Sequence, residues 1–146
     1  MTEDKNYRIL FVCSGNTCRS PMAEAAANHL LSGVEARSAG LATYAGMPAS
    51  PHSQQAMAEI GIDIRNHRSQ LVSRELLEWA DWVLTMTETH KKVLLQHAPE
   101  YKDKIFTLGE YCGDPVEISD PFGLSLDAYR LCRDQILADI QKIRLE

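Results

Sequence analysis

The chain has 146 residues, 45% of them hydrophobic, and these numbers fit one globular domain, residues 1–146, with a full apolar core. Its net charge of −5 and sequence pI near 5.5 argue against a nucleic-acid-binding surface or a polybasic membrane patch, both of which need clustered lysine and arginine. No apolar run approaches the roughly 20 residues of a membrane span and no apolar signal segment opens the chain, so we expect a cytoplasmic protein whose four cysteines are thiols.

The first predicted elements are a strand, a short loop and a helix. The strand covers Arg8–Cys13, a nearly continuous apolar run typical of a strand buried on both faces. After the loop, Ser20 is the predicted N-cap of the helix and Pro21 its first residue. We expect this helix to end at Gly33, because glycine favours the backbone conformation found just past a helix end.

The rest of the chain continues the alternation of strands and helices. A second strand begins at Val34 and is closed by Gly40, and further buried strands are expected over 81–86 and 104–108. Helices are expected after four capping residues: Ser50, Ser73, Thr87 and Ser125. This alternation predicts an α/β fold with a parallel sheet covered by helices on both faces, which binds ligands at the carboxyl ends of its strands.

One long segment, residues 110–123, shows no periodicity of either kind. Irregular segments of this length inside a compact domain usually carry function. The segment contains Asp120 in the sequence SDPFG, where Pro121 stiffens the chain and Gly123 permits a sharp turn. We therefore expect Asp120 to contribute to the site.

The loop after the first strand, in the sequence FVCSGNTCRSPMAE, has the composition of an anion-binding site. A tight turn from a strand into a helix can direct backbone N–H groups inward, and the helix N-terminus adds partial positive charge. Gly15 and Asn16 tolerate the backbone angles that such a turn requires. Arg19 offers a forked, permanently charged donor that suits two phosphate oxygens. Together these residues predict a site for a tetrahedral dianion.

Cys13 begins this loop, so its sulfur is expected beneath the anion. The dipoles that bind phosphate also stabilise a thiolate, and a thiolate below a phosphoryl group is a nucleophile directed at phosphorus. We expect phosphoryl transfer to sulfur followed by hydrolysis, with Asp120 as general acid in the first step and general base in the second. No metal or cofactor is needed, because backbone N–H groups and Arg19 supply the positive charge.

Cys13, five intervening residues and Arg19, followed by Ser20-Pro21 and by the late Asp120-Pro121, resemble the low-molecular-weight protein tyrosine phosphatases over essentially the whole chain. The resemblance implies a four-stranded parallel sheet flanked by helices in a three-layer, flavodoxin- or Rossmann-like fold. It also implies a cysteinyl-phosphate intermediate and phosphorylated proteins as substrates. Nothing in the sequence demands more than a monomer.

The resemblance also assigns supporting residues. It implies that Asn16 and Ser20 brace the loop, that Ser38 of RSAG supports this network, and that Cys18 forms a reversible disulfide with Cys13, which protects the nucleophile from over-oxidation. We expect His52, His67, His90 and His97 to be surface or hydrogen-bonded loop residues, with His67 bracing the region near the loop. The residues expected to bind phosphate and substrate are Ser14, Gly15, Asn16, Thr17, Cys18 and Phe122.

Thr17 and Phe122 depart from the tyrosine phosphatases, which typically carry a bulky aliphatic residue at the first position and tyrosine at the second. Both residues resemble the bacterial protein arginine phosphatases, a branch in which the threonine selects phosphoarginine. A hydroxyl at this position keeps the β-branched shape and adds a polar group that can interact with a guanidinium. Phe122 can stack on the guanidinium plane, and Asp120 can protonate the leaving nitrogen. The sequence thus predicts a protein arginine phosphatase.

Four alternatives remain open at this point. The first is a low-molecular-weight protein tyrosine phosphatase. An arsenate reductase of the same fold needs two further cysteines close together, but Cys112 and Cys132 are poorly spaced and Cys132 has the pattern of a core residue. Zinc binding through Cys13 and Cys18 lacks a second close pair of ligands. A non-catalytic phosphate-binding module is the fourth.

Overall fold

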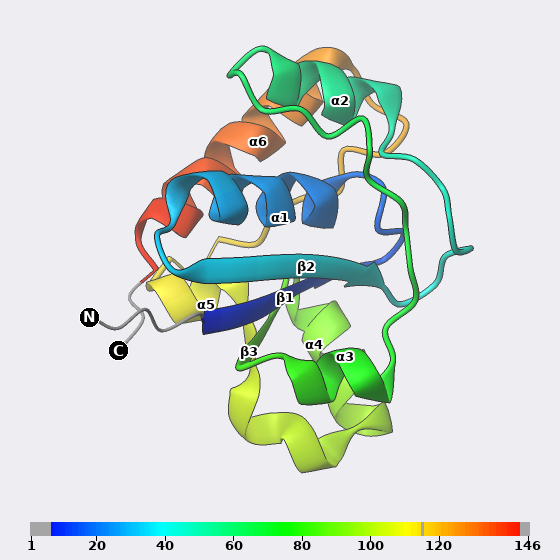
Figure 1. Ribbon diagram of the computed structural model, residues 1–146, viewed down its shortest axis with the longest axis vertical. Helices are drawn as coiled ribbons and strands as arrows, with labels where there is room; N and C mark the ends of the chain where they lie inside the picture. The colour runs from blue at the N-terminus through cyan, green and yellow to red at the C-terminus, as the bar shows by residue number, and fades with distance from the viewer. Residues whose placement is uncertain (1–6, 115, 144–146) are drawn as a thin grey trace.

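The computed structural model describes residues 7–114 and 116–143. A four-stranded sheet lies between two layers of helices, as Figure 1 shows. Its strands are β1 (Tyr7–Cys13), β2 (Val34–Gly40), β3 (Trp82–Thr85) and β4 (Ile105–Thr107). They are parallel and lie in the order β2-β1-β3-β4, with Cys13 opposite Gly40 and Val12 opposite Thr85. The predicted α/β fold with a four-stranded parallel sheet is confirmed.

Within residues 7–114 and 116–143, seven helical segments cover the two faces of this sheet. They are α1 (Arg19–Leu30), α2 (Pro51–Ala58), α3 (Arg74–Trp79), α4 (Glu88–His97), the 3₁₀ helix η1 (Pro99–Lys104), α5 (Leu108–Cys112) and α6 (Leu126–Gln141). In Figure 1, α1, α2 and α6 lie above the sheet, and α3 and α4 lie below it. Within the described residues no helix is both long and apolar enough to cross a membrane.

The central strand β1 supplies both apolar cores. Ile9 and Phe11 pack with α1, α5 and α6 on one side, while Leu10 and Val12 pack with α3 and α4 on the other. All four side chains are fully buried, so each contributes about 1.5–3 kcal/mol of apolar burial. Because β1 is packed on both faces, the loop that begins at its last residue, Cys13, starts from a strand buried on both sides.

Helix α1 begins two residues earlier than the capping pattern predicts. Its first residue is Arg19, its N-cap is Cys18, and no side chain caps it. Ser20 is therefore not the N-cap but a fully buried residue of the first turn. The first-turn amides are not closed by a side-chain cap, because the helix follows directly on the loop that begins at Cys13. The far end also differs, since α1 stops at Leu30 and Gly33 (φ 74°) follows three residues later.

The segment 110–123 is not irregular throughout, because α5 occupies its first part. Thr107 and Glu110 form a capping box at the start of α5, and Gly113 (φ 82°) ends the helix. A five-residue helix is too short for its apolar periodicity to be read from sequence. Position 115 of this segment, like both ends of the predicted domain 1–146, lies outside the described residues.

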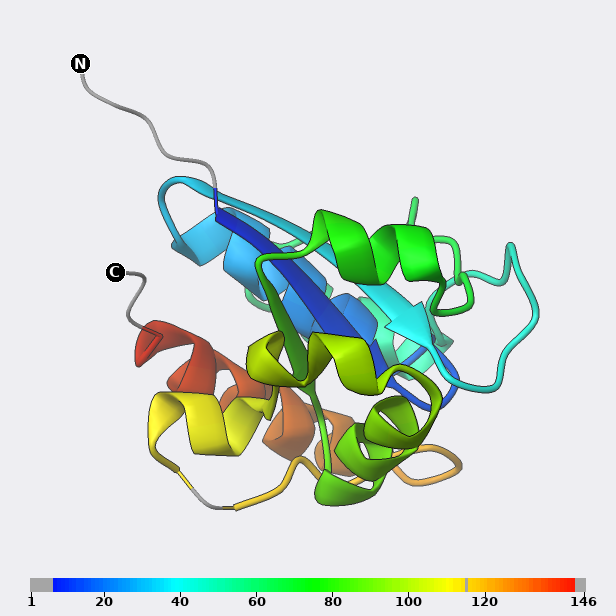
Figure 2. The same cartoon turned by 90° about the horizontal axis from the view of Figure 1, so that it is seen from below.

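The remainder of this segment leads to α6 across the carboxyl end of the sheet. Figure 2 shows that the loops after β1 and β2 and the segment before α6 gather at this same end. Backbone hydrogen bonds hold these segments at the sheet end. Leu41, after β2, donates to the carbonyl of Cys13, and Ile118, before α6, donates to the carbonyl of Met86, the residue after β3. The topology therefore brings Asp120 back to the Cys13 loop.

Candidate active site

A cavity of about 230 Å³ lies at the carboxyl end of β1. Its lining residues are Cys13, Ser14, Gly15, Thr17, Cys18, Arg19, Ala42, Asp120 and Phe122. Eight of these nine residues were predicted as site residues from the sequence. The structure thus brings the Cys13 loop together with a segment about one hundred residues further along the chain.

Cys13 lies on the floor of this cavity with only 2% of its surface exposed. Its sulfur lies 3.0 Å from the Ser20 hydroxyl and accepts a hydrogen bond of 3.3 Å from the backbone N–H of Asn16. Both contacts, together with the start of α1, surround the sulfur with polar groups.

Asn16 holds the loop in its unusual shape from beneath the cavity. Its backbone is left-handed (φ 57°) and its side chain is fully buried, so it does not line the cavity. The amide nitrogen donates to the hydroxyls of Ser20 (2.8 Å) and Ser38 (2.9 Å). The amide oxygen accepts from the backbone N–H of Gln70, and the backbone carbonyl lies 2.7 Å from Nε2 of His67. These contacts join Asn16, Ser20, Ser38 and His67 in one network. The bracing role that the resemblance implies for the first three, and that we expect for His67, stays a prediction.

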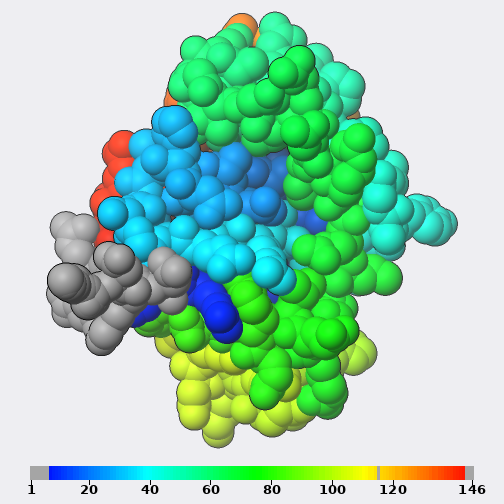
Figure 3. Space-filling view, in the orientation of Figure 1, coloured from blue at the N-terminus to red at the C-terminus, as the bar shows by residue number. Residues whose placement is uncertain are grey.

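Glu24 extends this network behind the loop, and no motif in the sequence indicates its role. The Ser38 hydroxyl donates to its carboxylate at 2.5 Å. Burial raises the pKa of Glu24, and the hydrogen bond from Ser38 opposes that shift. Figure 3 shows a hollow between α1 and the segment that follows α2, and residues lining it include Glu24 and His67. Only the position of Glu24 on the sheet-facing side of α1 could have suggested its role.

Arg19 is 4% exposed, and its guanidinium contacts the segment before α6 at two points. One terminal nitrogen donates to the Ile118 carbonyl at 2.9 Å, and the other lies 3.7 Å from the Asp120 carboxylate. The Nε atom is buried and has no hydrogen-bond partner among the described residues. Asp120 also accepts from the backbone N–H of Phe122 at 3.0 Å, and the Phe122 ring is 72% exposed at the mouth of the cavity. A forked cation and a carboxylate therefore face one cavity with the thiol.

Thr17 and Cys18 form the wall of the cavity nearest to α6. The Thr17 hydroxyl lies 3.9 Å from the Cys18 sulfur, which in turn lies 3.4 Å from the hydroxyl of Tyr129. Burial, and next the contact with Cys18, raise the pKa of Tyr129 to about 12. Cys13 and Cys18 are both free thiols, so their disulfide stays a prediction. Tyr129 joins the site through long-range packing that its sequence position does not reveal.

His90 also differs from the sequence-based expectation. It lies on α4 with 6% of its surface exposed, rather than on the surface or in a loop. Its Nε2 atom lies 2.9 Å from the Ser14 hydroxyl. The cavity therefore has a histidine directly behind one of its lining residues.

The two remaining cysteines lie outside the cavity. Cys132 is a buried core residue on α6, as predicted, and burial raises its pKa to about 12. Burial, and next the charge of Asp139, raise the pKa of Cys112 to about 11. Neither residue has the surroundings of an activated thiol. Among residues 7–114 and 116–143, no three histidine, cysteine or acidic side chains are placed to hold a metal ion.

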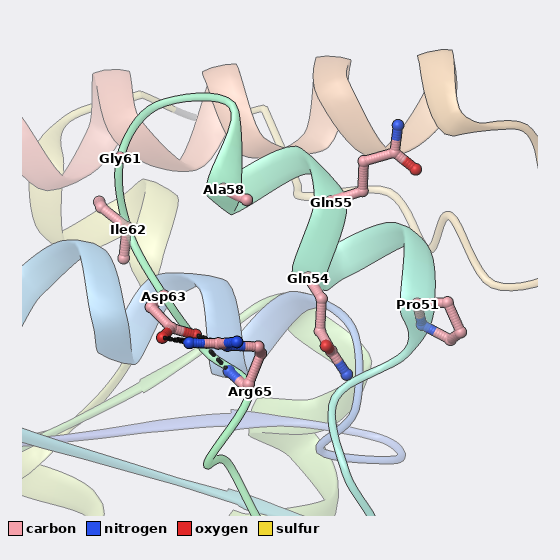
Figure 4. Close-up of a pocket in the computed structure, with 8 residues that line it drawn as sticks. All are labelled: Pro51, Gln54, Gln55, Ala58, Gly61, Ile62, Asp63 and Arg65. Carbon is pink, nitrogen blue, oxygen red and sulfur yellow. Dashed lines mark hydrogen bonds and ion pairs between the residues drawn. The ribbon is translucent and has the colours of Figure 1, made fainter.

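A groove larger than this cavity lies elsewhere among the described residues. Figure 4 shows it between α2 and residues 61–65, with a volume of about 630 Å³. Its charged residues, Asp63 and Arg65, pair with each other at 2.9 Å. The groove has no nucleophile and no free charge, so volume alone does not locate the chemistry of this protein.

A thiol held at a strand end under a helix N-terminus, with an arginine and a carboxylate above it, defines a cysteine-dependent phosphatase on an α/β fold. Residues 8–144 match the family described as "Low molecular weight phosphotyrosine protein phosphatase". The chain belongs to this family, which confirms the family predicted from the sequence.

Several known relatives are similar over nearly their whole length. The chain is 45% identical to a protein-arginine-phosphatase of Geobacillus stearothermophilus over 139 residues, which cover 94% of this chain and 93% of the relative. It is 39% identical to the low molecular weight protein-tyrosine-phosphatase PtpB of Staphylococcus haemolyticus over 137 residues, which cover 94% and 97%. The solved structure of YwlE arginine phosphatase from Geobacillus stearothermophilus superposes with a TM-score of 0.89 at 46% identity, covering 93% of this chain and 89% of that one.

Proposed function

We propose that this protein is a protein arginine phosphatase, which hydrolyses the phosphorus–nitrogen bond of phosphoarginine in proteins. The observation that carries the proposal is Thr17 on the wall of the cavity whose floor is Cys13. The similarity to relatives named as arginine phosphatases supports it. We further propose that the protein acts as a cytoplasmic monomer without a cofactor.

In the first step, the Cys13 thiolate attacks phosphorus and the phosphorus–nitrogen bond breaks. Arg19 and the inward-facing amides of residues 14–19 hold the phosphoryl oxygens, and the unpartnered Nε of Arg19 is a donor available for one of them. Asp120, in its protonated form, gives its proton to the leaving guanidine nitrogen. The products of this step are unmodified arginine and a phosphate bonded to sulfur.

In the second step, water attacks the phosphorus of the cysteinyl phosphate. Asp120 is now a carboxylate and accepts the proton of that water, and the phosphorus–sulfur bond breaks. Inorganic phosphate leaves and the thiolate of Cys13 is restored. The exposed position of Asp120 at the mouth of the cavity supports both of its tasks, because leaving group and water arrive from that side.

Three residues account for the choice of phosphoarginine. The Thr17 hydroxyl gives the wall a polar group beside the guanidinium, where an aliphatic branch would present only methyl groups. The exposed Phe122 ring is free to stack on the guanidinium plane. The carboxylate of Asp120 can accept from guanidinium N–H groups.

The test compares kcat/KM for matched phosphoarginine and phosphotyrosine peptides in the wild type, in Thr17→Ile and in Cys13→Ser. We expect the wild type to prefer phosphoarginine, and Thr17→Ile to lose about 5- to 150-fold of that preference, equivalent to ~1–3 kcal/mol. Cys13→Ser provides the blank. A wild type that prefers phosphotyrosine identifies a tyrosine phosphatase of the same family instead. Inactivity toward both peptides would support a non-catalytic phosphate-binding module instead.

A further inference from the structure

A buried imidazole contacts the catalytic loop from the helical layer opposite to α1. His90 follows the Thr87 cap of α4, and the Thr87 hydroxyl accepts from the backbone N–H of His90 at 3.3 Å. Helix α4 starts directly after β3, which pairs with β1. The side chain of His90 is thus fixed relative to the loop by the sheet itself, and its Nε2 atom lies 2.9 Å from the Ser14 hydroxyl.

The imidazole of His90 is neutral in the working pH range of an ordinary enzyme. Burial, and next the charge of Arg19, lower its pKa to about 4, against the opposing charges of Asp120 and Glu117. Arg19 belongs to α1, and Asp120 and Glu117 belong to the segment before α6. A neutral imidazole carries a single N–H, either on Nδ1 or on Nε2.

The surroundings of the ring decide between these two forms. Nδ1 of His90 is buried and has no hydrogen-bond partner among the described residues. A proton on Nδ1 would therefore be a buried donor without an acceptor, which is the rarer kind of unpaired group in folded proteins. A proton on Nε2 has the Ser14 oxygen as acceptor at 2.9 Å. The contacts favour the form with the proton on Nε2.

If Nε2 of His90 donates to the Ser14 oxygen, the Ser14 hydroxyl does not donate its own proton to the histidine. Ser14 lines the cavity beside Cys13, and its oxygen is already engaged by His90. The hydroxyl proton is then available to an acceptor on the cavity side, because Ser14 lines the cavity. The acceptor that the proposed reaction brings there is an oxygen of the phosphoryl group.

We propose that His90 is a positioning residue for the phosphatase reaction: by donating to the Ser14 oxygen, it directs the Ser14 hydroxyl proton to a phosphoryl oxygen in the cavity. This inference rests on the proposed function only in requiring a phosphoryl group in the cavity. It does not depend on whether arginine or tyrosine carries that group.

The kinetic test is a double-mutant cycle with p-nitrophenyl phosphate as the substrate, using Ser14→Ala, His90→Leu and the double variant. We expect each single variant to lose about tenfold in kcat/KM, the value of one hydrogen bond to a charged group, and the double variant to lose no more than one of them. A double variant that loses about a hundredfold would mean that the two residues act independently and would overturn the proposal. An active Ser14→Ala variant with unchanged kcat/KM would also overturn it.

Two further readouts separate positioning from packing. His90→Gln keeps a donor in place, so we expect it to recover most of the activity that His90→Leu loses, and equal activity of the two variants contradicts the proposal. In the wild type, ¹⁵N NMR of the imidazole reports which nitrogen carries the proton, and a proton on Nδ1 overturns the inference even where His90→Leu does not fold. Because neither readout uses phosphoarginine, failure of the arginine specificity leaves this test intact.

Discussion

The Arg19 guanidinium donates a hydrogen bond of 2.9 Å to the Ile118 carbonyl, and this contact ties the arginine to the segment that carries Asp120. The second terminal nitrogen of Arg19 lies 3.7 Å from the Asp120 carboxylate. One side chain therefore binds the backbone of that segment and faces its carboxylate as well. The position of the proposed general acid depends on the residue that is proposed to hold the phosphate.

We expect Arg19→Lys to inactivate the enzyme although it keeps the charge. Lysine is a point charge that cannot bind the Ile118 carbonyl and two phosphoryl oxygens at once. Loss of one transition-state donor lowers kcat by about 10²–10³-fold, and displacement of the Asp120 segment adds to that loss. The measurement is kcat with p-nitrophenyl phosphate. A kcat within tenfold of the wild type would show that charge alone suffices.

Asp120→Asn is expected to remove the proton donor while leaving the cavity intact. General acid catalysis contributes about 10²–10⁴-fold, so kcat for a phosphopeptide with a poor leaving group should fall by that amount. p-Nitrophenol leaves without help, so the loss with p-nitrophenyl phosphate should be smaller. The two substrates are compared in the same variant. Equal losses with both would contradict the role of Asp120 in protonating the leaving group.

Asp139 makes stability depend on pH at a place remote from the cavity. The side chain is fully buried on α6, and burial, with Asp114 beside it, raises its pKa from the ordinary 3.8 to about 6. The folded protein therefore binds this proton more tightly than the unfolded chain does. The stabilising contribution is present below about pH 4 and is lost as the pH rises to about 6.

We expect Asp139→Asn to remove this dependence. The free energy of unfolding of the wild type, relative to the variant, should decrease by about 1–2 kcal/mol between pH 4 and pH 7. Urea denaturation at both pH values measures it, and Asp103→Asn, an exposed carboxylate on η1, is the control. A difference between wild type and Asp139→Asn that stays constant with pH would refute the shift.

The core of the site could be predicted from the sequence because its chemistry is local. Cys13 and Arg19 lie in one short loop whose place follows from the rule for strand ends. Asp120 could be added because Pro121 and Gly123 mark a turn inside an aperiodic segment. The predicted strands and helices also formed, since each buried strand is a compact apolar run with a capping residue nearby.

The contacts of His90 and Tyr129 with the loop could not be predicted in the same way because long-range packing places these two residues. His90 reaches Ser14 across 76 positions of sequence, and Tyr129 reaches Cys18 across 111. Each lies on a helix at a position that periodicity explains equally well as ordinary core. No local pattern separates a buried tyrosine or histidine that contacts a loop from one that only fills space.

Gly40 is predicted from the sequence only as the end of the second strand, but in the structure it lies against the Cys13 loop. A Cβ atom at Gly40 would lie 2.7 Å from the Ser14 carbonyl oxygen and 3.1 Å from Cβ of Asn16. Neither neighbour can yield easily, since the first is backbone and the second is anchored by four contacts. We therefore expect Gly40→Ala to displace the Cys13 loop and lower kcat/KM at least about tenfold, with a loss of ~1–3 kcal/mol in stability.

Gly61→Ala is the matched control for Gly40→Ala. Gly61 has a left-handed backbone (φ 80°) with nothing within 4 Å of an added Cβ, so alanine there costs about 1 kcal/mol of stability without touching the Cys13 loop. Urea denaturation and p-nitrophenyl phosphate turnover are measured on both variants. We expect comparable losses of stability but a loss of kcat/KM in Gly40→Ala alone. Full activity in a folded Gly40→Ala variant would mean that the loop accommodates the methyl group and that its exact position does not limit the reaction.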